Sequence, residues 1–328
     1  MSQPPLLYFH MMADPALNPG AVELCVGEGD LNALLSLVES DTFADFCARF
    51  TCFFRSELAE LCPEELRQAL EMKGIRLLHA HQAQRSDEQT KPALSSTTEW
   101  LFGDWYLAQP PTPSGTQSAS RALSLKLLQQ VAADADTFEI ETIFRQEPVL
   151  AYHLLRLVNS LGTGVGRHIS SFSQAILILG RQQLKRWLNL MLFAANRNDY
   201  RSAMLLARVT VRARSMELLA GAIGLDRAQQ EQAFMIGMFS LLGTLFGMPL
   251  ADILRPLNLN DALSNAVLHG QGTLGSLLKA ACLAEQPDKQ GLSGQLEELA
   301  ISHAQFNQTN LEAHQWMLDV IHDKQETN

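Results

Sequence analysis

The sequence predicts a mainly α-helical protein in which a small α/β unit precedes an all-α helical bundle. Three observations support this fold class. In residues 108–120, AQPPTPSGTQSAS, prolines, a glycine and hydroxyl residues accumulate and the apolar periodicity stops. Short strand-like runs precede this segment, and almost every segment after it has apolar residues at helical spacing. We therefore expect two units, over residues 1–113 and 114–328.

The composition restricts the class of protein. Of the 328 residues 47% are hydrophobic and 18% are charged, which suits a globular chain with a sizeable core. The net charge of −10 disfavours nucleic acid and anionic membranes as partners, unless basic residues gather on one face. The absence of a basic leader and of an apolar run near 18 residues predicts a cytoplasmic protein. Its five cysteines, without a Cys-x-x-Cys spacing, are expected to be reduced core residues.

Two short strands and one helix are predicted in the first unit. The runs AVELCV at 21–26 and GIRLLHA at 74–80 are typical of strands. Between them PEELRQALEMKG predicts a helix, with Pro63 near its first turn and Gly74 at its end. The first unit is therefore expected to be α/β.

Helices are predicted throughout the second unit. Apolar residues recur at three- and four-residue steps after Pro148, and Ser171 with Gln174 has the spacing of a capping box. Further helices are expected at 121–133, 137–146, 181–195 and 201–224. A last segment, 231–247, is apolar on nearly every side and is predicted to be one buried helix.

Local motifs predict no catalytic, cofactor or metal site. The nine histidines form no His-Glu-x-x-His motif, and a strand would place His79 and His81 on opposite faces. The glycine-rich run 160–171 lacks the Gly-Lys-Ser/Thr ending of a phosphate-binding loop. No Ser-His-Asp or Cys-His arrangement can be assembled from neighbouring residues.

Basic residues provide one candidate interaction surface. Three arginines at seven- and four-residue steps can share a helix face, and a second basic group lies on another helix. With one tryptophan, the candidate set is Lys185, Arg186, Trp187, Arg201, Arg208 and Arg212. A solvated face with local pairs, such as Arg214 with Glu217, is the simpler interpretation. In either case we expect exposed charges, so that reversal of Arg208 and Arg212 leaves folding intact.

The second unit resembles a known domain. LLRLVNS, ISSFSQAILILG, LKRW and GMFSLLG are similar to the HDOD domain, a helical output domain of bacterial signalling proteins related to HD-type phosphohydrolases. The resemblance covers most of residues 118–285. It implies that Ser240 and Leu241 stand where catalytic relatives carry adjacent His and Asp metal ligands, and that Arg214 replaces a further histidine. Because a catalytic divalent ion needs imidazole and carboxylate ligands, the resemblance implies no metal, no cofactor and no catalysis.

The first unit resembles a fragment of the EAL domain, whose active members hydrolyse cyclic di-GMP. GIRLLHAHQAQ and WLFGDWYLAQPP are similar to two of its strand motifs, but Ala80 and Gly103 replace an expected glutamate and glutamine. No Glu-Ala-Leu tripeptide or Asp-Asp pair occurs. A barrel of this type needs about 250 residues, so we expect an open, degenerate sheet whose edges are covered by the helical unit or by another chain.

These expectations favour one functional hypothesis over two others. The chain is predicted to be a non-enzymatic regulatory protein that binds other signalling proteins, or a second copy of itself, in cyclic di-GMP-linked control of motility, biofilm or virulence. The second hypothesis is a nucleotide sensor that binds a cyclic nucleotide through the arginine face without cleaving it. The third is a divergent metal-dependent phosphohydrolase whose ligands lie outside the expected positions.

Overall fold

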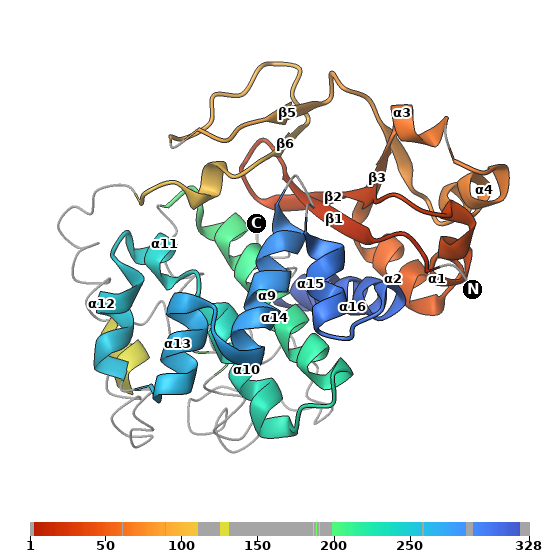
Figure 1. The fold of residues 1–328 in the computed structure, drawn as a ribbon. Coiled ribbons are helices and arrows are strands. Elements are labelled where there is room, and N and C mark those ends of the chain that lie inside the picture. Colours follow the sequence, from red (N-terminus) through yellow and green to blue (C-terminus); the bar gives the residue numbers. More distant parts are fainter. Residues whose placement is uncertain are drawn as a thin grey trace, which may run out of the picture.

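The computed structural model describes residues 3–60, 62–88, 90–110, 125–130, 199–257, 259–286 and 291–321, together with Arg186, Leu188 and Leu190. In this part of the chain an N-terminal sheet lies against a larger group of helices (Figure 1). A mostly helical protein with an N-terminal sheet was predicted, and this coarse fold class is confirmed. The helices predicted between residues 131 and 185 lie outside the described residues, as do Lys185 and Trp187.

The strands described here form one open sheet in the order β4-β3-β2-β1-β6-β5. β1 is antiparallel to both of its neighbours, whereas β2, β3 and β4 run parallel. The predicted strands fall on β2 and β4, and the sheet comprises β1 Leu7–Ala13, β2 Pro19–Val26, β3 Thr51–Arg55, β4 Arg76–Leu78, β5 Ala83–Arg85 and β6 Trp100–Phe102. His79 and His81 follow the end of β4 and stack with ring centroids 5.9 Å apart, so their predicted placement on opposite faces is wrong.

Short helices join these strands. The predicted helix is α4, which starts after Pro63 and ends before Gly74, whose φ of 78° lies in the left-handed region. Ser40 caps α2, because its side chain accepts a hydrogen bond from the Phe43 N–H. The elements are the 3₁₀ turn η1 Leu31–Leu34, α1 Leu35–Val38, α2 Asp41–Arg49, α3 Ser56–Ala59, α4 Glu64–Met72 and the 3₁₀ turn η2 Trp105–Leu107.

The helical part is arranged around α9, Ser202–Ala222, which packs against α10, α14 and α16. At Gly237 of α10 a Cβ atom would lie 2.7 Å from Ala213 Cα, so glycine permits the close approach of α9 and α10. The other helices are α10 Arg227–Phe239, α11 Leu242–Phe246, α12 Leu250–Leu254, the 3₁₀ turn η3 Arg255–Leu257, α13 Asp261–His269, α14 Gly272–Glu285, α15 Leu292–Glu298 and α16 His303–Ile321.

The segment predicted as one buried helix is broken in two. α10 ends at Phe239, and α11 begins at Leu242. At the break Ser240 Oγ donates to Gly237 O at 2.6 Å, a local bond that competes with continued helix. Among the described residues no single helix has both the length and the apolar character needed to span a membrane; the pair Arg227–Phe246 and Leu250–Leu257, bent by 117°, meets these measures only when taken together.

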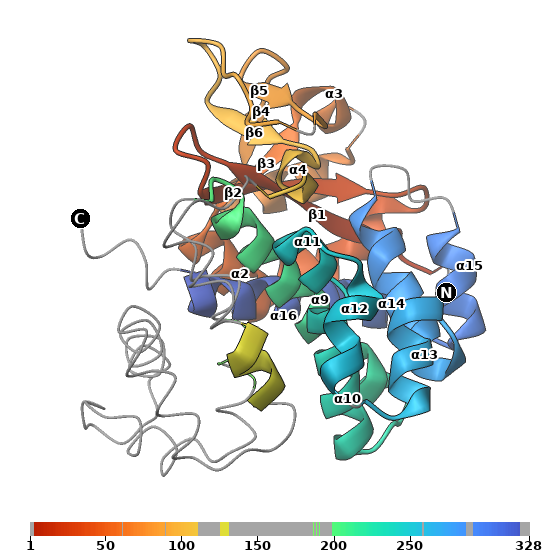
Figure 2. The same cartoon turned by 90° about the vertical axis from the view of Figure 1, so that its left-hand side faces the viewer.

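α16, the last described helix, is hydrogen-bonded to the first strand, β1. Asn307 Oδ1 accepts the Leu7 N–H at 2.7 Å, and Asn310 Nδ2 donates to Leu7 O at 3.1 Å. In Figures 1 and 2, α2 and α16 lie on the side of the sheet that faces the other helices. Buried residues of both predicted units form one apolar core, which includes Phe9, Phe46 and Met317. The helical part therefore covers one face of the sheet and bonds to the β1 backbone at Leu7, away from Ala13, where β6 pairs with β1.

His314 lies at the centre of this contact. Its side chain is buried, its Nδ1–H donates to Asn310 O at 2.8 Å, and its ring centroid lies 4.8 Å from that of Phe9. Burial lowers the pKa of His314 from 6.5 to about 4, although the Asn310 carbonyl and Glu285 favour the charged form. The ring is therefore neutral in the folded protein at neutral pH.

This burial predicts sensitivity to mild acid. An unfolded chain protonates His314 below pH 6.5, whereas the folded chain does so only near pH 4, so stability falls as the pH drops through this window. The loss is expected to reach about 3 kcal/mol. Denaturant titrations at pH 7 and pH 4.5 measure it. His314→Gln should reduce the difference between the two pH values, whereas His269→Gln, at an exposed position, should leave it unchanged.

Candidate functional site

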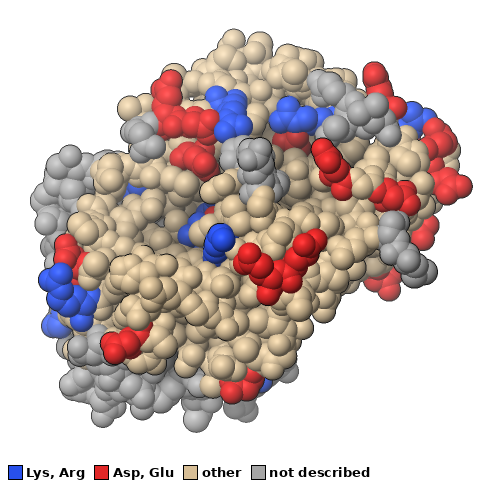
Figure 3. Space-filling view, in the orientation of Figure 1, with Lys and Arg blue, Asp and Glu red and all other residues tan. Residues whose placement is uncertain are grey.

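A cavity of about 100 Å³ lies between β1, the turn after β6, and helices α9, α14 and α16. One water needs only about 10–15 Å³, so the cavity has room for several waters or a small organic group. Its apolar wall includes Met11, Phe102, Met204 and Val211. Figure 3 shows a hollow on this face, between the sheet above and the helices below, with basic side chains inside it.

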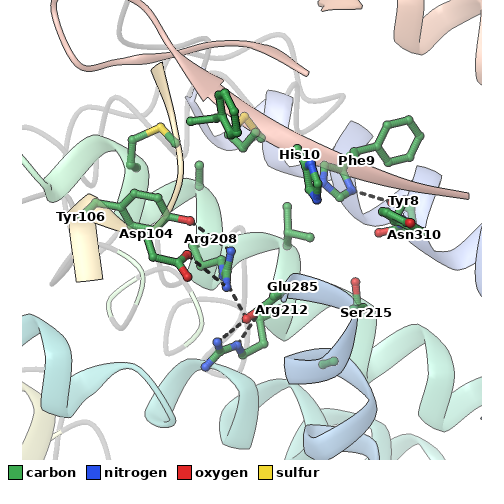
Figure 4. A pocket seen from close by; sticks show the side chains of 18 of the residues that line it. Tyr8, Phe9, His10, Asp104, Tyr106, Arg208, Arg212, Ser215, Glu285 and Asn310 are labelled. Atoms are coloured by element: carbon green, nitrogen blue, oxygen red, sulfur yellow. Dashed lines mark hydrogen bonds and ion pairs between the residues drawn. The ribbon is translucent and has the colours of Figure 1, made fainter. Parts of the chain in front are cut away.

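Two arginines of α9 meet one carboxylate in this cavity (Figure 4). Arg212 Nε donates to Glu285 Oε1 at 2.8 Å, and Arg208 Nε lies 2.9 Å from Glu285 Oε2. The arginines are one helical turn apart, and Glu285 is the last residue of α14. Arg208 Nη1 also donates to the Tyr106 hydroxyl at 3.0 Å. The cluster thus joins α9, α14 and η2.

The three charges stabilise one another. Burial alone would raise the pKa of Glu285, but Arg208 and Arg212 hold it below its usual range. Burial also opposes charge on Arg208 and Arg212, yet Glu285 raises the pKa of both. Asp104 Oδ1, 4.0 Å from Arg208, adds a second negative charge at the rim. The arginines are therefore internal ion-pair partners at neutral pH.

The expected exposure of the basic residues is wrong for Arg186, Arg201 and Arg212. Arg201 is fully buried, pairs with Asp199 at 2.7 Å and donates to the carbonyls of Ala108 and Thr244. Arg186 is also buried, 2.5 Å from Glu217 and 3.8 Å from the centre of the Phe234 ring. Arg212 is 7% exposed and Arg208 is mostly buried; Lys185 and Trp187 lie outside the described residues.

Helical spacing could not reveal this burial. It predicts that the arginines share a face, but the carboxylate that neutralises Arg208 and Arg212, Glu285, comes from a segment distant in the sequence. The local pair was predicted correctly, since Arg214 Nη1 donates to Glu217 Oε2 at 2.6 Å.

The positions matched to the HD metal ligands have other roles. Ser240 Oγ accepts a hydrogen bond from Arg212 Nη1 at 2.8 Å, so a guanidinium lies directly beside this residue. Leu241 is 4% exposed and belongs to the apolar core. Arg214 pairs with Glu217 and lies over the Trp316 ring, 6.0 Å from its centre. Ser240 is therefore hydrogen-bonded to Arg212, Leu241 packs in the core, and Arg214 forms a local ion pair.

A second polar cluster lies on the sheet and was missed from the sequence. His10 of β1 is directly opposite Glu23 of β2, and Cys25 follows two residues later on the same face. His10 Nδ1 lies 3.2 Å from Cys25 Sγ and 3.6 Å from Glu23 Oε2. Burial would raise the pKa of Glu23, but hydrogen bonds from His10 and Arg55 keep it low. Without a predicted β1, nothing in the sequence placed His10 beside these residues.

Comparison with known proteins identifies the helical domain. Residues 121–268 match the HDOD domain. A Vibrio cholerae protein named cyclic di-GMP phosphodiesterase CdgJ is 30% identical over 204 residues, which are 62% of this chain and 47% of that protein. The uncharacterized protein YuxH of Bacillus subtilis is 23% identical over 294 residues, 86% of this chain and 71% of that protein. The chain thus spans about half the length of CdgJ.

Two solved structures show limited similarity. A protein from Shewanella amazonensis SB2B, described as a phosphohydrolase, is 16% identical with a TM-score of 0.41, over 62% of this chain and 93% of that one. An HDOD domain protein of unknown function from Geobacter sulfurreducens is 15% identical with a TM-score of 0.37, over 64% of this chain and 92% of that one.

Proposed function

We propose that this chain, which contains an HDOD domain, is a non-enzymatic signalling protein that works by binding other proteins. The setting we propose is cytoplasmic, cyclic di-GMP-linked control of motility, biofilm or virulence. The family match and the name of the Vibrio cholerae relative support a role in signalling. Its partners would be other signalling proteins, or a second copy of the chain.

The contact between Arg212 and Ser240 is the observation that carries this proposal. A hydrolytic metal centre needs imidazole or carboxylate ligands to hold the ion and to activate its water. At this position Ser240 offers a hydroxyl that already accepts a bond from a guanidinium, and Leu241 offers none. The charge of Arg212 would also repel a divalent cation placed beside Ser240. These features support loss of the HD-type reaction with retention of the helical domain.

We place the partner-binding surface at the β4 edge of the sheet. β4 is the terminal strand in the sheet order, and edge strands offer backbone groups to another chain. Two large apolar side chains are exposed there: Met72, at the end of α4, is 87% exposed, and Leu77, within β4, is 48% exposed. The buried arginines of α9 are poorly suited to this role.

Partner capture tests this placement. The intact chain is used as bait in a lysate of its native host, and co-purifying proteins are identified by mass spectrometry. Leu77→Glu is expected to reduce the yield of the captured signalling partner about tenfold or more, because it puts a charge in the interface. Met248→Glu, at another exposed apolar position in the helical part, is the matched control and should retain capture. Equal yields from both variants would contradict this placement.

A nucleotide sensor is the second candidate function. The cavity supports it, because Arg208, Tyr106 and Asn310 contribute polar groups to an otherwise apolar wall. Its volume of about 100 Å³ is nevertheless below the roughly 300–1,000 Å³ of most ligand sites, and Glu285 already engages both arginines. Calorimetric titration with cyclic di-GMP tests this candidate, and micromolar binding by the purified chain would favour it over the protein-binding role.

A further inference from the structure

Three side chains with different metal-ligating atoms meet on neighbouring strands. His10, Glu23 and Cys25 supply an imidazole nitrogen, a carboxylate oxygen and a sulfur, and these atoms all lie within 4.8 Å of one another. Glu23 is 1% exposed and Cys25 is 8% exposed. The antiparallel register fixes their positions, because His10 pairs directly with Glu23 and Cys25 pairs with the neighbouring Tyr8.

The spacing of these atoms suits tetrahedral coordination. Bonds of about 2.0–2.3 Å from zinc to nitrogen, oxygen and sulfur, meeting at tetrahedral angles, place the ligand atoms about 3.4–3.6 Å apart. The distance from His10 Nδ1 to Glu23 Oε2 is 3.6 Å, and that from His10 Nδ1 to Cys25 Sγ is 3.2 Å. The nitrogen–oxygen distance is about 0.2 Å longer than the corresponding edge of such a tetrahedron, and the nitrogen–sulfur distance is about 0.3 Å shorter than its edge, so small side-chain shifts bring the three atoms to tetrahedral positions.

Arg55 of β3 is compatible with this arrangement. Its Nη2 donates to Glu23 Oε2 at 3.1 Å, and its Nε donates to Glu23 Oε1. A carboxylate has about four lone-pair sites, so a two-bond contact with arginine leaves each oxygen able to accept another partner. Partners of this kind orient the carboxylates that bind metals. The negative charges of the Glu23 carboxylate and the Cys25 thiolate would balance the two positive charges of Zn²⁺. With the Arg55 guanidinium included, the net charge of the site would be +1.

We infer that His10, Glu23 and Cys25 form a zinc site with one open coordination position. A thiolate with an imidazole favours zinc over magnesium or calcium, which prefer oxygen ligands. On binding, the Cys25 thiol loses its proton to water and its sulfur lone pair forms the bond to the ion. His10 also lines the cavity, and we place the fourth position on that side, where water or a small donor molecule can bind. This inference goes beyond the proposed protein-binding function.

Metal binding by the full chain tests the inference. Protein stripped with a chelator is titrated with Zn²⁺ against a chromophoric competitor, and with Co²⁺ to detect thiolate-to-cobalt absorption. We expect one tight site per chain, about 100-fold weaker binding in Cys25→Ser and in His10→Gln, and no cobalt–thiolate band in Cys25→Ser. Cys52→Ser is the matched control, because Cys52 is a buried cysteine on the adjacent strand β3 whose thiol donates to Phe50 O at 3.4 Å.

Other results would separate this inference from the proposed function. If Cys25→Ser and Cys52→Ser bind zinc as tightly as the unaltered chain, or if no tight site is found, the zinc site is wrong and the proposed function is unaffected. A tight site that survives in Cys25→Ser but is lost in Ser240→Ala would overturn both. Zinc should also raise the melting temperature of the unaltered chain and of Cys52→Ser, but not that of Cys25→Ser.

Discussion

Joint reversal of Arg208 and Arg212 to glutamate is expected to unfold the protein at neutral pH. Both guanidiniums now face Glu285, and the double variant would place three carboxylates together in a mostly buried cluster. Removal of one partner from a buried ion pair costs about 3–5 kcal/mol. The free energy of unfolding of a folded protein is only about 5–15 kcal/mol. The loss of both ion-pair partners, together with the new repulsion, can therefore exceed the total stability of the protein. This corrects the expectation that the reversal leaves folding intact.

Circular dichroism at pH 7 provides the measurement. The double variant should lack a cooperative thermal transition, and each single reversal should lower the melting temperature strongly. Arg255→Glu is the matched control, since Arg255 has a side chain 78% exposed and pairs with Asp252 three residues away. Exposed pairs contribute about 0–1 kcal/mol, so this control should melt within a few degrees of the unaltered chain. A double variant that melts normally would show that the cluster is solvated.

Replacement of Leu241 by aspartate is expected to destabilise the protein by several kcal/mol without creating catalysis. Leu241 is 4% exposed within the apolar core, so the new carboxylate must stay charged without a partner or take up a proton. Its folded-state pKa is then raised above that of the unfolded chain. The penalty should therefore be largest at neutral pH and should shrink as the pH falls toward 4.

Denaturant titrations at pH 7 and pH 4.5 can check this prediction. Leu77→Asp, at a position 48% exposed, is the control and should change the free energy of unfolding by less than about 1 kcal/mol. Equal stability of Leu241→Asp and the unaltered chain at neutral pH would place residue 241 outside the core. Hydrolysis gained by this variant would instead show that a carboxylate at residue 241 is enough to restore the metal centre.

Local sequence patterns predicted the elements that depend on local chemistry. Pro63 and Gly74 marked the ends of α4, and residues 201–224 were predicted as the helix that is α9. The break at Ser240 was missed because apolar spacing continues through it, whereas in the structure the Leu241 N–H bonds to Met238 O, three residues back, and Ser240 Oγ donates to Gly237 O. The sheet order was also beyond the sequence, since β1 pairs with residues far along the chain at Leu101.

The candidate sites depend more strongly on tertiary contacts than the individual helices and strands do. The resemblance predicted that Ser240 and Leu241 supply no metal centre, but the sequence could not show that Arg212 lies beside Ser240. Nor could spacing on α9 reveal Glu285, which is 73 residues from Arg212 and converts an expected surface charge into a buried ion pair. The burial of Arg208 and Arg212 therefore depends on a partner that their spacing does not indicate.

Hydrolysis by the purified chain tests the central claim most directly. The intact chain, supplied with Mg²⁺ or Mn²⁺, is incubated with cyclic di-GMP and with a chromogenic phosphodiester, and product is measured against a reaction without protein. The proposed non-enzymatic role predicts no product above this background with either metal, because Ser240 and Leu241 cannot hold a hydrolytic ion next to Arg212. Metal-dependent turnover that is lost in Ser240→Ala would contradict the account.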